Sequence, residues 1–534
     1  MRCSSTTVVD ARALERLSRP RRDIVSECAA GTSDRAADAG TLTFGLEVGA
    51  FRRYERTVHV EAADEPDTFR VTQTFDYALA LPVWWIFYAW PVRRALLRPQ
   101  PLDAMPWWAP PSRLDARAAT VLGLVACLST ICGYLGTVIT QTITFAADEF
   151  DVSKAGQSDA LSAVRIGIFL SLAMTALADR RGRRRLAVGG AAVAIVFTAL
   201  GALSPDLWVL GATQTVARGV TTAVGVLIVV IAAEELPAGS RAYGISVLAL
   251  SAALGSGMAV WALPLADLGE RGWRLIYVIP LLALPFLPAL ARRLPETRRF
   301  ESSLAADPLS SHHHHAIAKN RLALLCAAGF LVLLFRTPAS QLQNEFLRDE
   351  RGFSGTKIAL FTIITSTPAG LGVFLGGRLA DSRGRRMIAA IGLTFGALFT
   401  VLGFTSDGWS LWLFTLIAMV VSALTVGPLG VYGPELFATR SRSRANGLVT
   451  FAGVIGSVVG LTIAGRLGDR WNLGAALAVL SIGPILLAIL VLRRFPETAR
   501  LELEELNPDD APVTATSPTP TAPAPVEDTS DARP

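Results

Sequence analysis

One arginine stands inside a long apolar run of the sequence. Arg218 lies within residues 208–232, and Gln214 and Thr222 fall on the same helical face at a spacing of four residues. A guanidinium in the middle of a hydrocarbon layer costs at least about 2.5–3.5 kcal/mol unless it faces water or a partner. We therefore predict that these three residues bind a substrate. The alternative is a buried structural ion pair or a hydrogen-bonded strut.

A second arginine lies in another apolar run, residues 322–344. Arg336 has Ser340 and Gln343 at helical spacing, and Pro338 between them can interrupt the helix. We predict that these three residues also contact the substrate. The alternative is that Arg336 extends toward the membrane surface or bonds the carbonyl groups that the proline frees.

A stripe of small polar residues runs along the first apolar segment, residues 118–144. Thr137 and Thr140 follow Gly133 on this stripe. We include both threonines in the predicted substrate site. Small residues at this spacing also serve the close packing of membrane helices, and that alternative stays open.

The apolar runs contain no Asp or Glu away from their ends. Two central arginines without a carboxylate partner favour an anionic substrate, such as a small organic acid whose own charge completes the pairing. The nearest acids are Asp148 and Glu149 at the end of the first run. Proton coupling would need one of these, or a glutamate at the opposite helix ends.

Membrane-spanning helices must position these side chains. Of 534 residues, 51% are hydrophobic and 18% are charged, and the mean hydropathy is +0.43, whereas soluble domains carry about 25% charged residues. A spanning helix needs about 20 mainly apolar residues. We predict twelve spans, at residues 118–144, 160–178, 187–204, 208–232, 243–265, 275–291, 322–344, 357–377, 387–406, 410–433, 446–464 and 472–492.

The loops between these runs predict the orientation. Arg and Lys gather in alternate loops, at 180–185, 292–299, 383–386 and 440–444. The side richer in positive charge should be cytoplasmic, which places both termini inside. Because the basic residues are mostly arginine and alanine is frequent, we expect the plasma (inner) membrane of a bacterium. The pI of about 9.3 does not indicate nucleic acid, since the arginines lie between the apolar runs.

The sequence repeats itself at an offset close to 201 residues. ARRLPETRRFE at 291–301 matches LRRFPETARLE at 492–502, and LADRRGRRR around Asp179 matches LADSRGRR around Asp381. Matches of this kind recur in the same order along both halves. We conclude that a six-helix unit was duplicated as two parallel repeats, an arrangement found in many secondary transporters.

The repeated motifs resemble those of the major facilitator superfamily. The two loop motifs, the paired PET-x-R motifs, GWR at 272–274 and PELFATRSR at 434–442 are similar to those of its sugar porters and metabolite–proton symporters. The chain departs from the family pattern at Thr175 and Ala438, where glycine and proline are usual. The resemblance implies an all-α membrane protein of two pseudo-symmetric six-helix bundles, with a central site lined by the first helix of each three-helix unit.

The resemblance also implies a cytoplasmic gate of charged residues at the helix ends. Ion pairs there would hold the bundles together while the central cavity faces outward, and each exposed pair contributes only about 0–1 kcal/mol. The alternative is that the arginines only set the orientation. The gate is predicted to comprise Asp179, Arg183, Glu235, Arg241, Glu296, Asp381, Arg385, Glu435, Arg442 and Glu497.

Five segments are expected along the chain. Residues 1–117 form a cytoplasmic extension with a β-hairpin, in which RTVHVEA and FRVTQTF alternate in polarity, and an aromatic segment at 77–92 suited to the membrane interface. Residues 118–295 and 321–495 are the two bundles. Residues 296–320 are a cytoplasmic linker that carries His312–His315, and 496–534 are a disordered cytoplasmic tail.

Together these features predict a secondary transporter that works by alternating access. The substrate is predicted to be an anionic metabolite, with uptake that protons could drive, and the bilayer is its other partner. Sugar uptake and multidrug or metabolite efflux are alternatives within the same fold, and a membrane sensor without transport is one from another class. We find no nucleotide-binding loop or nucleophile–base motif, and we expect no enzyme activity, cofactor, metal site or nucleic acid partner.

Overall fold

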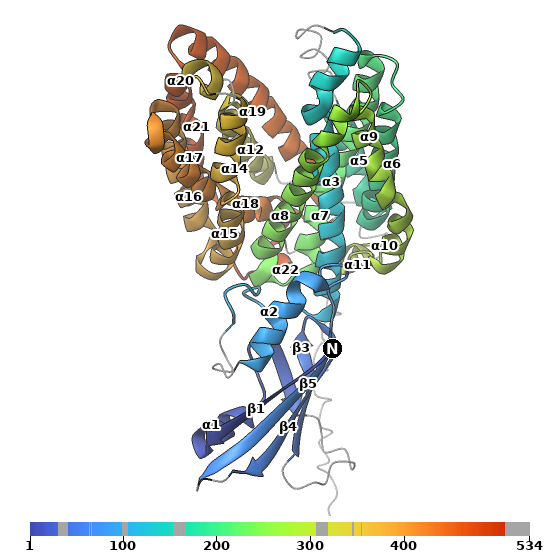
Figure 1. Cartoon of the computed structure of the whole chain (residues 1–534), viewed down its shortest axis with the longest axis vertical. Coiled ribbons are helices and arrows are strands. Elements are labelled where there is room, and N and C mark those ends of the chain that lie inside the picture. The colour runs from blue at the N-terminus through green and yellow to red at the C-terminus, as the bar shows by residue number, and fades with distance from the viewer. Residues whose placement is uncertain are drawn as a thin grey trace, which may run out of the picture.

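The computed structural model describes residues 1–29, 41–63, 65, 67–98, 105–152, 164, 167–305, 319–343, 346–353, 355–439 and 441–507. It consists of a large helical part and a smaller domain built on a β-sheet, which lies at one end of the helices (Figure 1). The histidine run at 312–315 and the tail beyond residue 507 lie outside the described residues.

The N-terminal domain is a five-stranded antiparallel sheet with the strand order β1-β5-β4-β3-β2. The predicted hairpin is confirmed as β4 and β5, which pair from Phe51 with Leu79 to Ala62 with Phe69. The rest of the sheet was not predicted. Its strands are β1 (Arg2–Asp10), β2 (Val25–Ala29), β3 (Thr41–Gly49), β4 (Phe51–Ala62) and β5 (Thr68–Leu79).

Two helices cover one face of this sheet. Helix α1 (Ala11–Leu17) is capped by the Asp10 carboxylate, which accepts from Ala13 N at 2.8 Å, and places Leu17 against Val58 and Val71. Helix α2 (Trp85–Leu97) packs through Val92 and Leu96 on the other half of the same face. The opposite face of the sheet carries threonines and charges, as alternation along the strands requires.

A buried charge cluster ties α2 to the sheet. The Glu27 carboxylate accepts from Tyr54 Oη at 2.6 Å and pairs with the Arg56 guanidinium at 2.8 Å. Arg21 pairs with Asp23 and donates to the carbonyl oxygens of residues 95 and 96, the last turn of α2. Burial and the Glu27 charge raise the pKa of Tyr54, so its hydroxyl remains a donor. The charges are tolerated because each one has partners.

The helical part consists of two bundles of similar build, joined by α11 (Arg298–Ala305) and the linker. The first bundle contains α3 (Ala116–Glu149), α5 (Ile168–Arg181), α6 (Arg183–Gly201), α7 (Leu207–Glu235), α8 (Arg241–Trp261), α9 (Trp273–Val278) and α10 (Leu287–Arg293). The second contains α12 (Lys319–Gln341), α14 (Gly355–Ser366), α15 (Ala369–Arg383), α16 (Arg385–Thr405), α17 (Gly408–Ala423), α18 (Val426–Glu435), α19 (Arg442–Arg470), α20 (Leu473–Leu480) and α21 (Ile482–Arg494), and α22 (Leu503–Leu506) follows.

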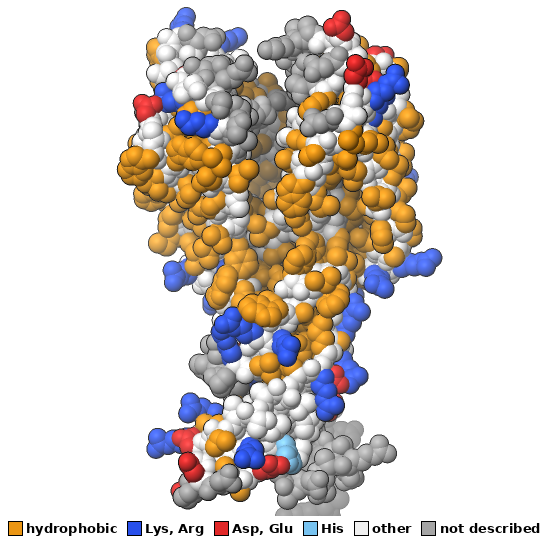
Figure 2. All heavy atoms as spheres, viewed as in Figure 1, with side chains coloured by type: hydrophobic (Ala, Val, Ile, Leu, Met, Phe, Trp, Pro, Cys, Tyr) orange, Lys and Arg blue, Asp and Glu red, His pale blue; other side chains and the backbone are white. Residues whose placement is uncertain are grey.

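Among the described residues, eleven helical stretches are long and apolar enough to span a membrane. Eleven of the twelve predicted runs match them. The remaining run, 160–178, contains α5, and part of it lies outside the described residues. Hydrophobic side chains cover the middle of the helical part, and charges lie toward its two ends (Figure 2). The all-α, membrane-spanning prediction therefore holds for this part, and the sheet is an addition to it.

Close helix pairs repeat in both bundles. A Cβ at Gly255 of α8 would lie 1.8 Å from the Thr130 carbonyl oxygen of α3, and a Cβ at Gly456 of α19 would lie 2.3 Å from that of Phe330 on α12. Only glycine permits this approach of two helix backbones. The shared contact shows that the two halves have the same internal packing.

The buried cluster predicts a sharp effect in the sheet domain. Replacing Glu27 with Ala removes the partner of Arg56 and Tyr54, and leaving a buried charge unpaired costs about 3–5 kcal/mol. In the full-length protein in detergent, tryptic cleavage within residues 1–79 should begin at a lower urea concentration in Glu27→Ala than in the unchanged protein. Glu47→Ala, on the exposed face, should change stability by no more than about 0.5 kcal/mol. Equal urea midpoints for the two variants would contradict a structural role for the cluster.

Candidate functional site

Arg218 of α7 reaches across to α3. Its guanidinium donates from Nη1 to the Gly136 carbonyl oxygen at 2.5 Å, and the side chain is half-buried. A Cβ at Gly136 would meet open space, so this carbonyl borders a gap. Thr222 is half-buried and bonds its own helix, whereas Gln214 is 1% exposed. A Cβ at Gly201 of α6 would lie 2.7 Å from Gln214 Nε2, so Gln214 packs inside the first bundle and is separated from Arg218.

Arg336 of α12 stands in the second bundle near the place equivalent to Gly136. Thr130 and Phe330 are matched by their contacts with a glycine of the neighbouring helix. Six residues after Thr130 on α3 is Gly136, and six residues after Phe330 on α12 is Arg336. Arg336 thus corresponds, to within one residue, to Gly136 of α3, whose carbonyl oxygen Arg218 binds. Arg336 and Ser340 are exposed and Gln343 is half-buried.

The two arginines also lie at similar heights in the helical part. Sixteen residues separate Arg218 from Glu234 at the end of α7, or about 24 Å at 1.5 Å per residue. Fifteen separate Arg336 from Arg321, which donates to the Leu436 carbonyl beside Glu435, or about 22 Å. Each half thus contributes one guanidinium to the same level of the molecule.

The two threonines of α3 have different surroundings. Thr137 Oγ1 bonds Ser256 Oγ of α8 at 2.9 Å and its own helix at Gly133. This contact joins two helices of one bundle, as the packing alternative required. Thr140 is exposed and bonds only the preceding turn among the described residues. Thr140 stays a predicted substrate contact, and the contacts of Thr137 favour packing.

Glu149 at the far end of α3 belongs to a structural ion pair. Its carboxylate lies 2.9 Å from Arg274 Nη2 and accepts from Trp273 Nε1 at 2.7 Å, which fastens α3 to α9. Burial raises the pKa of Glu149, but the hydrogen bonds and charge of Arg274 outweigh it and hold the pKa below the ordinary value. Glu149 is therefore poorly suited to carry a proton near neutral pH. The side chain of Asp148 lies outside the described residues.

Two buried ion triads join the bundles at the end nearest the sheet. In the first, Glu234 of α7 lies 2.5 Å from Arg442 of α19 and 3.6 Å from Arg183 of its own bundle. In the second, Glu435 of α18 lies 3.2 Å from Arg241 of α8 and also pairs with Arg385. These side chains are almost fully buried. Each triad contains one glutamate, one arginine from the same bundle and one arginine from the other.

Two aspartates add a second kind of link between the bundles. The Asp179 carboxylate accepts from the backbone N of Ser443 and Arg444 at 3.1 and 2.9 Å, at the start of α19. The Asp381 carboxylate accepts from Tyr243 N at 2.9 Å, at the start of α8. Each aspartate thus caps a helix of the opposite bundle, where the helix dipole favours a negative charge. We call the two triads and these aspartates the charge network.

Glu296 and Glu497 act within their own bundles. Glu296 accepts from the backbone N of Arg183 at 3.0 Å, and Glu497 accepts from that of Arg385 at 2.9 Å. The turn before each arginine is a glycine with positive φ, at 96° for Gly182. The glutamates therefore fix the loops that present the network arginines, and they do not themselves cross between the bundles.

The structure corrects the predicted role of Glu235. Its carboxylate lies 2.9 Å from Arg117 Nε and accepts from Arg298 N at 2.9 Å, both on the first-half side of the chain. Glu234 occupies the cross-bundle position. Adjacent helix residues point about 100° apart, so only one of the two can face the other bundle. A constant offset of 201 would have paired Glu234 with Glu435 in the sequence.

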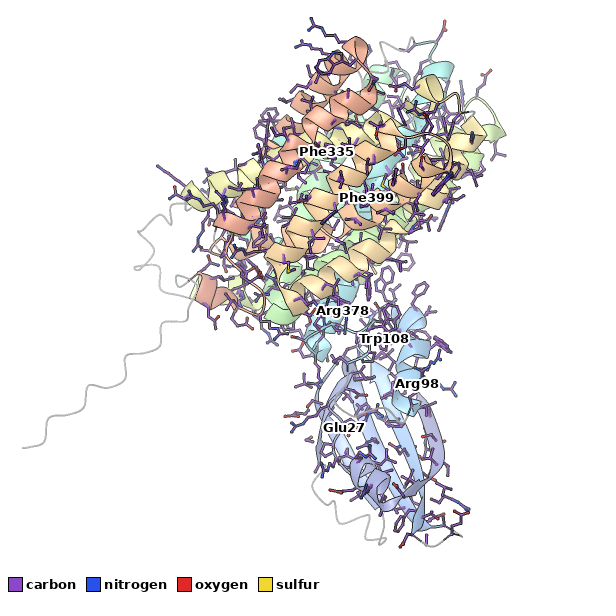
Figure 3. All side chains as sticks on the ribbon, turned by 90° about the vertical axis from the view of Figure 1, so that its left-hand side faces the viewer. Glu27, Arg98, Trp108, Phe335, Arg378 and Phe399 are labelled. Atoms are coloured by element: carbon purple, nitrogen blue, oxygen red, sulfur yellow. The ribbon has the colours of Figure 1, made fainter. Side chains whose placement is uncertain are left out.

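A segment that was not predicted also bridges the bundles. Residues 105–114, which we call the strap, connect α2 to α3. Ser112 N donates to Ser240 Oγ at 2.9 Å beside α8, and the Ala109 carbonyl accepts from Arg378 of α15 in the second bundle. Tyr243 donates to the Trp108 carbonyl at 3.1 Å. Figure 3 shows Trp108 and Arg378 at the junction between the sheet domain and the helices.

Sequence comparison finds a family for the second half of the chain. Residues 324–524 match the family described as Major Facilitator Superfamily. The match covers less than half of the chain, which is therefore similar to this superfamily from α12 onward. A "Putative metabolite transport protein" of Haemophilus influenzae is 25% identical over 334 residues, which is 59% of this chain and 80% of that one.

Solved structures share the fold of this chain. The proton:xylose symporter XylE, bound to 6-bromo-6-deoxy-D-glucose, has a TM-score of 0.64 at 17% identity, covering 74% of this chain and 99% of that one. The human organic anion transporter MFSD10 has a TM-score of 0.56 at 16% identity, covering 70% and 99%. FucP in the outward conformation has a TM-score of 0.55 at 14% identity, covering 70% and 99%.

The conformation of this protein is asymmetric along its long axis. The charge network holds the bundles together at the end nearest the sheet. At the opposite end the two lobes stand apart (Figure 2). Among the described spans, no Asp or Glu lies away from the helix ends. Arg218 and Arg336 lie at about the same height in the helical part, which we call the arginine level. This level lies between the closed end and the end at which the lobes stand apart.

A cysteine at Ser246 tests the charge network. Ser246 is buried against Gly377 and Gly427 of the second bundle. In a background without the five native cysteines, Glu234→Gln should speed its reaction with a maleimide at least tenfold, since tenfold needs only about 1.4 kcal/mol and breaking a buried pair costs about 3–5 kcal/mol. Glu235→Gln is the matched control. Equal labelling rates in the two variants would refute the assignment of Glu234.

The Glu149 ion pair predicts a separate result. Because its folded pKa is depressed, its contribution to stability is fully present above the ordinary value of 4.5 and is lost only as the pH falls through the lower folded value. Glu149→Gln should therefore lower thermal stability at pH 7, by about 1–3 kcal/mol for the weakened charged hydrogen bonds. The pH profile of uptake between 5 and 8 should not change. A shifted profile would make Glu149 a proton carrier.

Proposed function

We propose that this protein transports a small organic anion by alternating access, with the two bundles rocking about the arginine level. The observation that carries the proposal is the placement of Arg218 and Arg336, one from each half, at similar heights along the helices. When the bundles close around a bound anion, both guanidiniums can contact it. The substrate then stabilises the intermediate in which neither side is open.

An anion suits this level better than a neutral sugar does. Carboxylates bind arginine through paired, charge-assisted hydrogen bonds. Neutral sugars need amide and hydroxyl groups, and Gln214 packs inside its bundle, away from Arg218. The described spans hold no Asp or Glu away from their ends, so the charge at this level is positive, which favours an anion. A monocarboxylate or dicarboxylate of metabolite size is the class we propose.

The orientation belongs to the same proposal. We place the charge network, the sheet domain and both termini in the cytoplasm and the protein in the plasma membrane, because the arginine-rich loops lie at the network end. The parted end then faces outward, as uptake requires. A weak acid can bring its own proton, so proton-driven uptake does not need a carboxylate inside the membrane.

Two alternative functions are each supported by one observation. The fold likeness to the proton:xylose symporter favours sugar uptake. The folded sheet domain, whose strap touches both bundles, favours a sensor that binds solute without moving it. Flux of a labelled acid into proteoliposomes separates both from the proposal.

The test is uptake of labelled organic acids and sugars into proteoliposomes, with and without a pH gradient. Arg218→Ala and Arg336→Ala should each reduce kcat/KM for the transported acid about 10- to 100-fold, because a hydrogen bond to a charged group contributes about 1.5–3 kcal/mol. Lysine at either position should restore part of the activity. Arg271→Gln is the control, since Arg271 is 83% exposed at the far end.

Two outcomes would overturn the proposal. If neutral sugars cross the membrane and acids do not, the anion assignment is wrong. If acids bind to the purified protein but none crosses, the protein is a sensor.

A further inference from the structure

A cavity lies between the sheet domain and the helices. Its volume is about 410 Å³, within the range of about 300–1,000 Å³ typical of small-molecule sites. Four parts of the chain build it: the sheet domain through β4 and β5, helix α2, the strap, and the helices α3, α8 and α15. Neither Arg218 nor Arg336 lines it, and it borders the charge network at Tyr243, whose N donates to Asp381. Representative lining residues are Tyr88, Trp108, Leu122, Val247, Leu254 and Phe374.

The walls of this cavity are almost entirely apolar. Aromatic and aliphatic side chains make up most of the lining, and Arg113 is the one charged residue among the described residues that line it. Apolar walls around an empty space lose the dispersion contacts that packing would provide. Water gains little from such a surface, because it needs two to four polar partners. An apolar occupant is therefore the one that fits.

The shape of the cavity indicates which kind of apolar molecule it can hold. Along α8 its lining extends from Tyr243 to Leu254, a rise of about 16 Å at 1.5 Å per residue. Two lining side chains are also exposed on the surface, Phe87 at 68% and Leu254 at 38%. They lie on the apolar faces of α2 and α8, so the cavity opens toward the hydrocarbon layer. An alkyl chain from the membrane can enter through this mouth.

Arg113 provides a polar contact for such a chain. Its Nε donates to the Asp23 carbonyl oxygen at 2.8 Å, which holds the side chain at the strap. It forms no ion pair with any carboxylate that the structure describes. A half-buried guanidinium in this position can bind a carboxylate or phosphate head.

We propose that the cavity binds the alkyl chain of an anionic amphiphile, with its head at Arg113. The amphiphile is a free fatty acid or a phospholipid of the bilayer, two sources of the same chemistry. Its chain fills the space between the strap and α8. This site does not depend on what the transporter carries.

Photolabelling of the full-length protein in phosphatidylcholine nanodiscs tests the proposal. One arm uses palmitic acid with a diazirine near the end of its chain, and a second uses phosphatidylglycerol with the same labelled chain. Mass spectrometry should find the label in peptides covering α2, the strap and residues 243–254. Label from palmitic acid identifies a free fatty acid, label from phosphatidylglycerol identifies a lipid, and either result supports the site.

Two variants with a control make the test specific. Leu254→Trp fills the mouth and should reduce labelling about tenfold, since about two methylene groups lose their burial. Met258→Trp lies one turn further along the same helix, is 43% exposed and does not line the cavity, so it should leave labelling unchanged. Arg113→Gln should weaken labelling by palmitic acid but not by its diazirine-bearing methyl ester.

The proposal is wrong if the cavity peptides carry no more label than the lipid-facing surface of α21, or if Leu254→Trp and Met258→Trp behave alike. Equal effects of Arg113→Gln on the acid and the ester would overturn the anionic head.

Discussion

The structure depends on one constraint: the buried arginines between the bundles must keep their carboxylate partners. Arg241 and Arg442 are almost fully buried, and each depends on a glutamate of the other bundle. Removing one partner of a buried pair costs several kcal/mol, but parting the bundles admits water to both charges at once. The closed end is therefore weakened by loss of a single partner and still able to open as a unit. Such a two-state element is what alternating access requires.

The sequence predicted the fold through its repeats but could not show which groups meet. The motifs around Asp179 and Asp381 identified the helix ends, yet capping of the opposite bundle depends on how two whole bundles dock. The sequence predicted Glu235 for the position between the bundles that Glu234 occupies. Neighbouring glutamates have the same chemistry, and only their directions around the helix distinguish them. In the sheet domain, only β4 and β5 alternate strongly enough to be recognised. Within β4, the buried Arg56 interrupts the apolar pattern that strand prediction uses, so the residues from Phe51 to Glu55 fell outside the predicted hairpin.

The sheet domain and the transporter share more than a covalent link. The strap touches α8 of one bundle and Arg378 of the other, at the end where the network closes. Opening that end would separate the two attachment points. The same strap lines the apolar cavity, so an occupant there and the state of the charge network act on the same ten residues. The sheet domain, the cavity and the charge network are thus connected through the strap.

The central claim is that the two ends of the helical part open in turn. Electron–electron distance measurements on spin labels in proteoliposomes test it most directly. One pair, at positions 180 and 383, reports on the network end, and another, at 205 and 409, reports on the opposite end; all four residues are exposed. On addition of a transported anion, the account predicts that the first distance lengthens in the molecules whose second distance shortens. Two distances that stay fixed, or that change in the same direction, would contradict it.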